Sequence, residues 1–277
     1  MIKTNRGLDW HYDVCGSGDA ILFIHGFGGS SRWWQAQKKF LRGGYQVITV
    51  DLPGHGESAW MPMTLHDLAV DLRQIIAACG VSQLNIVASS FGGLIALELY
   101  RMVPQDIMRI SFVGSIPKFA RGPQYPAGLD IGKIHTLSSQ FDPSTVAQDS
   151  AQGLREDYGA VLDIFFRSLF TMPERDSERF QWVKELRRAE PLPRREALKC
   201  FLDILEKTDL RDRLAGVICP VQFITGSDDH ICPAPIMAWL QEHFLNARFD
   251  VIEGCGHLPF LTKPDEYNEL LEDFLIK

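Results

Sequence analysis

The feature that most constrains this chain is a series of short apolar runs, rich in β-branched residues and separated by longer segments. These runs follow one another as Ala20–Ile24, Tyr45–Val50, Leu84–Ala88, Ile110–Val113, Val221–Thr225 and Ala247–Ile252. Nearly continuous apolar character over so few residues is typical of strands that are buried on both faces of a parallel sheet. The sequence therefore predicts a parallel sheet at the centre of the protein.

Helical patterns separate several of these runs. Leu65–Cys79 carries apolar residues at helical spacing and ends before Gly80, a suitable C-terminal cap. Leu94–Val103 and Pro264–Leu275 also have a helical pattern. Strands that alternate with helices predict an α/β fold with a mostly parallel, doubly wound sheet.

The alternation stops between residues 117 and 194. This stretch is rich in turn residues at first and then has helical patterns at Leu154–Phe170 and Glu178–Arg188, without a clear buried strand. Open α/β sheets bind their ligands at the carboxyl edge of the strands. We therefore expect a core of residues 1–116 and 195–277, with residues 117–194 as a helical lid over that edge.

Composition excludes several classes of protein. A chain of 277 residues with a net charge of −7 has room for one large domain with an insertion, and it is not expected to bind nucleic acid by charge. Its six cysteines show no zinc-binding spacing, so no metal or cofactor is expected. Neither a signal peptide nor an apolar run long enough to span a bilayer is visible, which predicts a cytoplasmic protein with no membrane contact. We also expect a monomer.

The first chemical motif lies where the third apolar run meets a helix. Ala88-Ser-Ser-Phe-Gly-Gly93 has the small residues that a nucleophile elbow needs, because this sharp turn leaves little room beside the exposed serine. Ser90 fits the motif better than Ser89, since Ser90-Phe91-Gly92 completes it. The alternative is an ordinary strand–helix turn.

The second motif, His25-Gly-Phe-Gly-Gly29, directly follows the first run. Acyl transfer needs two preorganised N–H donors for the oxyanion, and we assign them to the backbones of Phe27 and Phe91. A glycine-rich loop can also bind phosphate, but the sequence has neither a P-loop nor a complete dinucleotide-binding motif. Nucleotide binding is therefore not expected.

An acid and a base follow the last two runs. A serine needs an imidazole to take its proton and a carboxylate to orient that imidazole, and the order Ser90, Asp229, His257 is the one expected of this architecture. Each of the three comes just after a predicted strand, so all should meet at one edge of the sheet. Asp228 is the alternative acid.

These motifs resemble those of the α/β-hydrolase superfamily over nearly the whole chain. The matching segments are His25-Gly-Phe-Gly28, Asp51-Leu-Pro-Gly-His-Gly-Glu-Ser58, Ser90-Phe-Gly-Gly93, Gly226-Ser-Asp-Asp229 and Gly256-His257. The resemblance implies the α/β-hydrolase fold and favours Asp229 over Asp228. Leu192–Leu198, Leu202–Arg211 and His257–Pro264 resemble more specifically the pimeloyl-acyl-carrier-protein methyl ester esterases of biotin synthesis.

The resemblance implies a serine carboxylesterase that removes the methyl ester from a pimeloyl chain held on an acyl carrier protein. The alternatives are a general short-chain carboxylesterase or thioesterase, a lyase or synthase that uses the triad for proton transfer, and a ligand receptor on the same fold. Acyl length and leaving group are not determined by the sequence.

Further residues are expected to contact the substrate or the carrier protein. Phe165 and Phe166, with Phe27 and Phe91, are the expected lining of an acyl channel. In the resembling family, lid arginines face the acidic carrier protein, which here implies a docking patch of Arg167, Arg175, Arg179, Arg187 and Arg188. The alternative is a solvated helix face of mixed charge.

Overall fold

A computed structural model describes residues 1–122, 125, 128–130, 132, 134–135, 139, 141, 153–244 and 246–276. Its centre is a seven-stranded sheet in the order β3-β5-β4-β6-β7-β8-β9. Only β3 runs antiparallel to its neighbour. The strands of this sheet are β3 (Tyr12–Cys15), β4 (Asp19–Ile24), β5 (Tyr45–Val50), β6 (Leu84–Ser89), β7 (Ile107–Val113), β8 (Val221–Gly226) and β9 (Ala247–Ile252).

The six predicted strands are confirmed as β4 to β9. Every residue of β6 and β8 is buried, as near-continuous apolar runs require. The sequence did not predict β3, which is short and only half-buried at the edge of the sheet. A separate two-stranded ribbon of β1 (Ile2–Lys3) and β2 (Asp9–Trp10) also lies outside the prediction.

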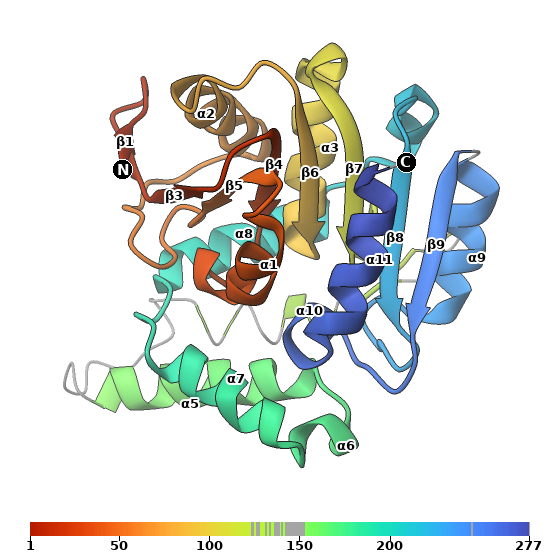
Figure 1. Ribbon diagram of the computed structural model, residues 1–277. Helices are drawn as coiled ribbons and strands as arrows, with labels where there is room; N and C mark the ends of the chain where they lie inside the picture. The colour runs from red at the N-terminus through yellow and green to blue at the C-terminus, as the bar shows by residue number, and fades with distance from the viewer. Residues whose placement is uncertain are drawn as a thin grey trace.

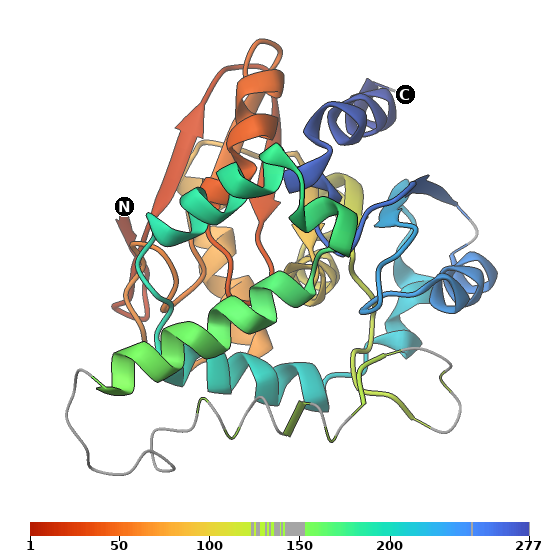
Figure 2. The same cartoon turned by 90° about the horizontal axis from the view of Figure 1, so that it is seen from below.

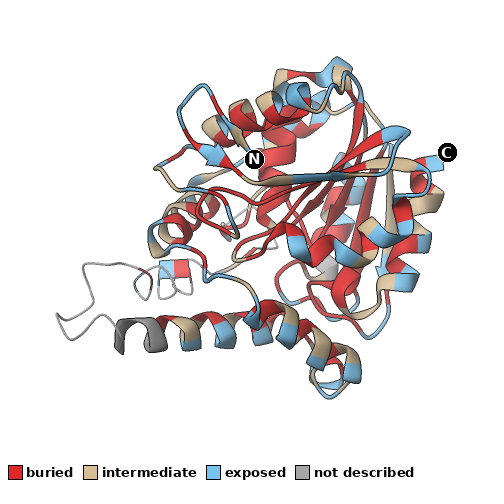
Figure 3. Ribbon diagram, turned by 60° about the vertical axis from the view of Figure 1, so that its left-hand side comes forward, coloured by how far each residue is buried: buried red, intermediate tan, exposed pale blue. Residues whose placement is uncertain are grey.

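Helices cover both faces of the sheet (Figure 1). On one face lie α1 and α11, and on the other lie α2 and α3, while α9 packs beside β9. The strands and the sides of the helices that face the sheet consist mainly of buried residues, and exposed residues lie on the outer sides of the helices and in loops (Figure 3). These helices are α1 (Gln35–Leu41), α2 (Leu65–Ala78), α3 (Phe91–Met102), α9 (Ala234–His243) and α11 (Pro264–Ile276).

The remaining helices gather at the carboxyl ends of the strands. Figure 1 shows the strand arrowheads pointing toward α5 and α7, and Figure 2 shows α7, α5 and α8 lying across that end of the sheet. Within the described residues, the predicted lid thus contains helices and two isolated β-bridges, but no strand. The helices of the predicted lid are α5 (Gly153–Ser168), α6 (Met172–Arg175) and α7 (Glu178–Arg188). The helices α8 (Arg195–Lys207) and α10 (Pro259–Thr262) lie at the same end of the sheet but belong to the predicted core.

The short 3-10 helices η1 (Ser31–Trp34), η2 (Pro104–Asp106) and η4 (Arg211–Gly216) connect these elements. None of the helices in the described part of the chain is both long and apolar enough to cross a membrane.

A buried carboxylate ties α3 to its surroundings. Glu98, only 4% exposed, accepts hydrogen bonds from Arg101 at 2.6 Å and from Arg213 of η4 at 2.7 Å, and it lies 2.9 Å from His66 Nδ1 of α2. Burial by itself raises the pKa of Glu98. The hydrogen bonds from Arg101 and His66 and the charge of Arg213 outweigh burial and hold that pKa below its usual value.

We expect Glu98→Gln to lower the free energy of unfolding by about 1–3 kcal/mol at pH 7, because charge-assisted hydrogen bonds are lost. A lowered folded-state pKa stabilises the protein above the unfolded value of about 4.3. The difference between variant and wild type should therefore shrink as the pH falls below that value. Urea unfolding at pH 7 and pH 4 measures it, with the exposed Glu242→Gln as control. An equal difference at both pH values would contradict this.

Candidate active site

Ser90 occupies the turn between β6 and α3 in a strained conformation. Its φ of 49° and ψ of −117° make it the one non-glycine residue with positive φ in the described part of the chain. Three hydrogen bonds hold its backbone. Ser90 N–H donates to Val113 O at 2.9 Å, and Ser90 O accepts from the Ser115 hydroxyl at 2.7 Å and from the Gly93 N–H at 2.9 Å. Strain maintained in this way is typical of functional sites, where the surrounding structure overrides local preference.

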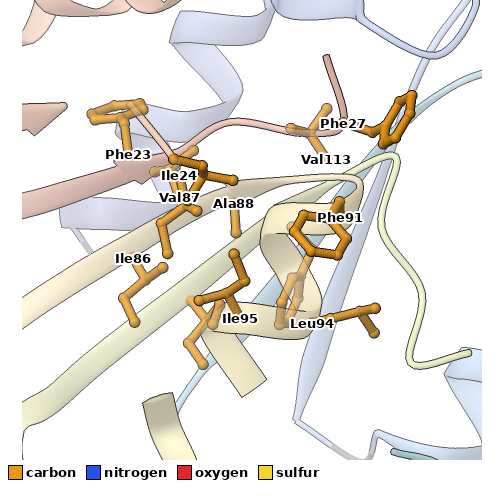
Figure 4. Close-up of a cluster of buried hydrophobic side chains, with 14 of the residues drawn as sticks. Phe23, Ile24, Phe27, Ile86, Val87, Ala88, Phe91, Leu94, Ile95 and Val113 are labelled. Atoms are coloured by element: carbon orange, nitrogen blue, oxygen red, sulfur yellow. The ribbon is translucent and has the colours of Figure 1, made fainter. Parts of the chain in front are cut away.

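Small residues let the turn close against the end of β4. A side chain on Gly92 would place its Cβ 2.7 Å from Ile24 O, which explains the glycine at this position. Ala88, which stands where the motif usually has glycine, is fully buried within β6 and accommodated between its neighbours (Figure 4). Its methyl group therefore does not prevent the elbow from forming.

His257 and Asp229 form a buried pair at the same edge of the sheet. His257 Nδ1 lies 2.8 Å from Asp229 Oδ2, and both side chains are almost fully buried. The other carboxylate oxygen, Oδ1, accepts the backbone N–H groups of Ile231 at 2.8 Å and Cys232 at 3.0 Å. Since a carboxylate only accepts, Nδ1 carries the proton and Nε2 has a lone pair available as a base.

Opposing effects act on the ionisation of Asp229. Burial by itself raises its pKa, but the charge and hydrogen bond of His257, together with the two backbone donors, outweigh burial and leave the pKa lowered. The carboxylate therefore stays ionised at neutral pH and orients the imidazole.

A cavity of about 900 Å³ opens beside these residues. Ser90, His257 and Phe27 line it together, while Asp229 lies behind the imidazole. The Ser90 hydroxyl has no hydrogen-bond partner among the described residues. This does not argue against Ser90 as a nucleophile, because the contact between a nucleophile and its base commonly tightens only when substrate is bound. The rest of the wall is mostly apolar and comes from residues 119–169, from α8 and from the loop after β8. Its apolar members are Phe119, Leu129, Ile134, Val161, Ile164, Phe165, Leu169, Leu202, Leu205 and Ile231.

The alternative nucleophile and acid lie elsewhere. Ser89 is buried within β6, does not line the cavity and has no partner for its hydroxyl in the described chain. Asp228 is exposed and accepts a hydrogen bond from the Ser227 hydroxyl at 2.7 Å. The geometry thus favours Ser90 over Ser89 and Asp229 over Asp228.

Phe27 and Phe91 present their backbones at the elbow. Neither backbone N–H donates to an acceptor within the described chain, so both are available to a ligand. Their rings differ: the Phe27 ring lines the cavity and packs edge-on against Phe165 at 5.3 Å. The Phe91 ring is buried away from the cavity and stacks on Phe201 at 4.4 Å.

Two expected substrate contacts therefore need correction. The rings of Phe91 and Phe166 are not among the described residues that line the cavity. Phe166 packs instead against Trp33 at 5.4 Å and Phe170 at 5.1 Å, since it lies on the side of α5 that faces the protein core. Of the two lid phenylalanines, only Phe165 reaches the cavity.

The predicted arginine patch is also only partly formed. Arg187 is 5% exposed and cannot face a partner, which corrects its assignment. Arg175 Nε donates to Phe170 O at 3.0 Å, and Arg179 Nε donates to Leu261 O at 2.8 Å, so both partly serve the fold. Arg167 and Arg188 are exposed.

One group of potential metal ligands was found among the described residues, formed by Asp229, Cys232 and His257. The aspartate and the histidine already pair with each other. Burial raises the pKa of the Cys232 thiol well above its usual value, which keeps it protonated and a poor ligand. The chemistry of this group does not favour a metal.

Sequence reasoning missed two residues that shape the site. Glu190, after α7, accepts the Ser30 hydroxyl at 2.5 Å and Trp33 Nε1–H at 3.2 Å, and so holds the end of the loop that contains Phe27. Gly114 follows β7 with φ of 54°, and a Cβ there would lie 2.7 Å from His257 Cε1. The only signal for Gly114 was a glycine directly after a predicted strand.

We expect Gly114→Ala to displace the His257 ring and to slow any reaction that uses it as a base by about 100-fold or more, because catalysis tolerates little misplacement. The initial rate with p-nitrophenyl acetate measures the effect. Gly80→Ala, where φ is also positive and a Cβ meets nothing within 4 Å, is the matched control. Equal rates for the two variants would show that the close approach is unimportant.

Comparisons with known proteins agree with this architecture. Residues 21–270 match the model of the alpha/beta hydrolase family. A pimeloyl-[acyl-carrier protein] methyl ester esterase of Xanthomonas campestris pv. campestris is 30% identical over 270 residues, covering 96% of this chain and 98% of that protein. The protein of the same name from Nitrosomonas europaea is 28% identical over 262 residues, which cover 93% of this chain and 96% of that protein.

Solved structures share the fold. An esterase from Exiguobacterium antarcticum superposes with a TM-score of 0.86 at 22% identity, covering 100% of this chain and 98% of that one. A bromoperoxidase from Bacillus anthracis gives a TM-score of 0.83 at 26% identity, covering 98% and 96%. With its mostly parallel sheet and a family match over most of its length, the chain belongs to the alpha/beta hydrolase family.

Proposed function

We propose that this protein is a serine carboxylesterase that hydrolyses an acyl methyl ester, and that its substrate is pimeloyl-acyl-carrier-protein methyl ester in biotin synthesis. The curated relatives carry this activity in their names. The observation that carries the proposal is the buried Asp229–His257 pair, whose imidazole lines the same cavity as Ser90 on its strained turn.

In the proposed mechanism, Ser90 Oγ attacks the ester carbonyl while His257 Nε2 takes its proton. The oxyanion that forms accepts hydrogen bonds from the backbone N–H groups of Phe27 and Phe91, which donate to no acceptor in the described chain. His257 then protonates the departing methoxide, which leaves as methanol. Water attacks the acyl-enzyme while His257 takes its proton, and His257 returns that proton to Ser90 Oγ as the acid is released.

The cavity suits an acyl chain. Phe165 and Leu169 of the proposed lid face Leu202 and Leu205 of α8 across it, so a hydrocarbon chain would be enclosed mainly by apolar side chains. We assign the lid to residues 117–194, with α8 of the core contributing the opposite wall. Cytoplasmic location and a monomeric state remain predictions from the sequence.

We expect Ser90→Ala to lower the turnover of p-nitrophenyl esters by several orders of magnitude, because Ser90 is the proposed nucleophile and lines the same cavity as His257. Ser89→Ala, the buried neighbouring serine, is the matched control and should keep most of its activity. Unchanged turnover in Ser90→Ala would refute the assignment of the nucleophile.

The same variants distinguish the specific esterase from a generalist. Expression of the wild type should rescue a biotin auxotroph that lacks this methyl esterase, and Ser90→Ala should not. Hydrolysis of simple esters without rescue would indicate a short-chain carboxylesterase or thioesterase. Absence of multiple turnover with any ester would favour a receptor, or a lyase or synthase.

The exposed lid arginines are the proposed contacts for the acidic carrier protein. We expect the double charge reversal Arg167→Glu and Arg188→Glu to raise KM for a carrier-bound methyl ester by about tenfold at low salt. Turnover of p-nitrophenyl acetate should stay unchanged, because neither arginine lines the cavity. Arg42→Glu, an exposed arginine outside the lid, is the control. An unchanged KM in the double variant would exclude this docking patch.

A further inference from the structure

The lid contains a buried carboxylate that the proposed mechanism does not use. Glu174, the third residue of α6, is 6% exposed, and no described Lys or Arg forms a salt bridge with it. Its Oε2 accepts the backbone N–H groups of Thr171 at 2.7 Å and Gly256 at 2.9 Å, and its Oε1 accepts the Thr262 hydroxyl at 2.5 Å. The buried carboxylate is therefore satisfied by hydrogen-bond donors rather than by a cation, and the Cys255 thiol is a further polar neighbour of it.

One of these donors belongs to the loop that carries the base. Gly256 immediately precedes His257, and the His257 N–H itself donates to Leu169 O of the lid at 2.8 Å. Two consecutive backbone N–H groups of this loop are thus bound by Leu169, just after α5, and by Glu174 within α6. The packing is close, because a Cβ on Gly256 would lie 2.4 Å from Leu169 O.

The position of Glu174 is itself fixed by the sequence around it. Thr171 and Glu174 form a reciprocal capping box at the start of α6, with Glu174 N–H donating to Thr171 Oγ1 at 3.2 Å. The carboxylate is therefore held from the lid side while it binds the histidine loop. Movement of this part of the lid would be transmitted to the backbone at His257.

We propose that Glu174 is a positioning residue that sets the backbone of His257, so that the lid contributes to the geometry of the triad as well as covering the cavity. This inference rests on the proposed function, because it assigns no chemistry to Glu174 itself. Glu174 acts through Gly256 and does not line the cavity.

The same chain offers a way to separate positioning from helix capping. In α2, the capping box of Thr64 is completed by Asp67, so an aspartate is sufficient for this role. Glu174→Asp should therefore keep the cap of α6 and the negative charge. Its carboxylate would be one methylene shorter and withdrawn from Gly256 and Thr262.

The test is the rate at which a fluorophosphonate labels Ser90, measured together with kcat and KM for p-nitrophenyl acetate. We expect Glu174→Asp to slow labelling and lower kcat about tenfold or more, with KM and the melting temperature close to those of the wild type. Glu174→Gln should recover most of the rate, because its amide oxygen can still accept the Gly256 N–H while its NH2 faces the Thr262 hydroxyl. Glu185→Asp, an exposed glutamate on α7 shortened in the same way, is the control.

The outcomes separate this inference from the proposed function. If the wild type is labelled at Ser90 and Glu174→Asp is labelled equally fast, Glu174 has no positioning role, while the esterase proposal is unaffected. Wild type that is not labelled refutes the esterase proposal itself. If Glu174→Asp does not fold, the second variant Thr262→Val tests the same inference, because it removes a donor that holds the Glu174 carboxylate. A lowered kcat at unchanged KM in Thr262→Val supports the positioning role. An unchanged kcat overturns it.

Discussion

The hydrogen bond between the buried Asp229 carboxylate and the His257 imidazole is the interaction on which the rest of the site depends. Taking a carboxylate out of water is costly, and here the cost is offset by His257 and by the backbone N–H groups of Ile231 and Cys232. The same contacts keep the acid ionised and fix the imidazole tautomer. Asp229 is thus the residue that orients the imidazole in the proposed triad, although burying its carboxylate is unfavourable by itself.

The sheet explains how residues so distant in sequence can meet. In a parallel sheet all carboxyl ends lie at one edge, and β4, β6, β8 and β9 end there with the loops of Phe27, Ser90, Asp229 and His257. Close approach between these loops requires missing side chains at particular points. Gly92 and Gly114 provide them, one beside the elbow and one beside the imidazole.

The segment proposed as the lid makes direct contacts with both loops of the candidate site. Glu174 and Leu169 bind the loop of His257, and Glu190 binds the loop that follows Phe27. Burial raises the pKa of Glu190, although its hydrogen bonds with Ser30 and Trp33 act in the opposite direction. The segment that contributes apolar side chains to the cavity wall therefore also binds the loops of the proposed triad.

The sequence by itself determined the six long strands and the main helices, and it predicted the order of the proposed nucleophile, acid and base, because burial on both faces of a strand and sharp strand–helix turns leave local patterns. It could not decide between the faces of a helix, so Phe165 and Phe166 were both expected at the cavity although only Phe165 lines it. Nor could it show that Arg187 is buried, or that Glu174 and Gly114 lie against the histidine loop and the His257 ring. Those facts depend on contacts between residues far apart in the chain, which only the tertiary structure decides.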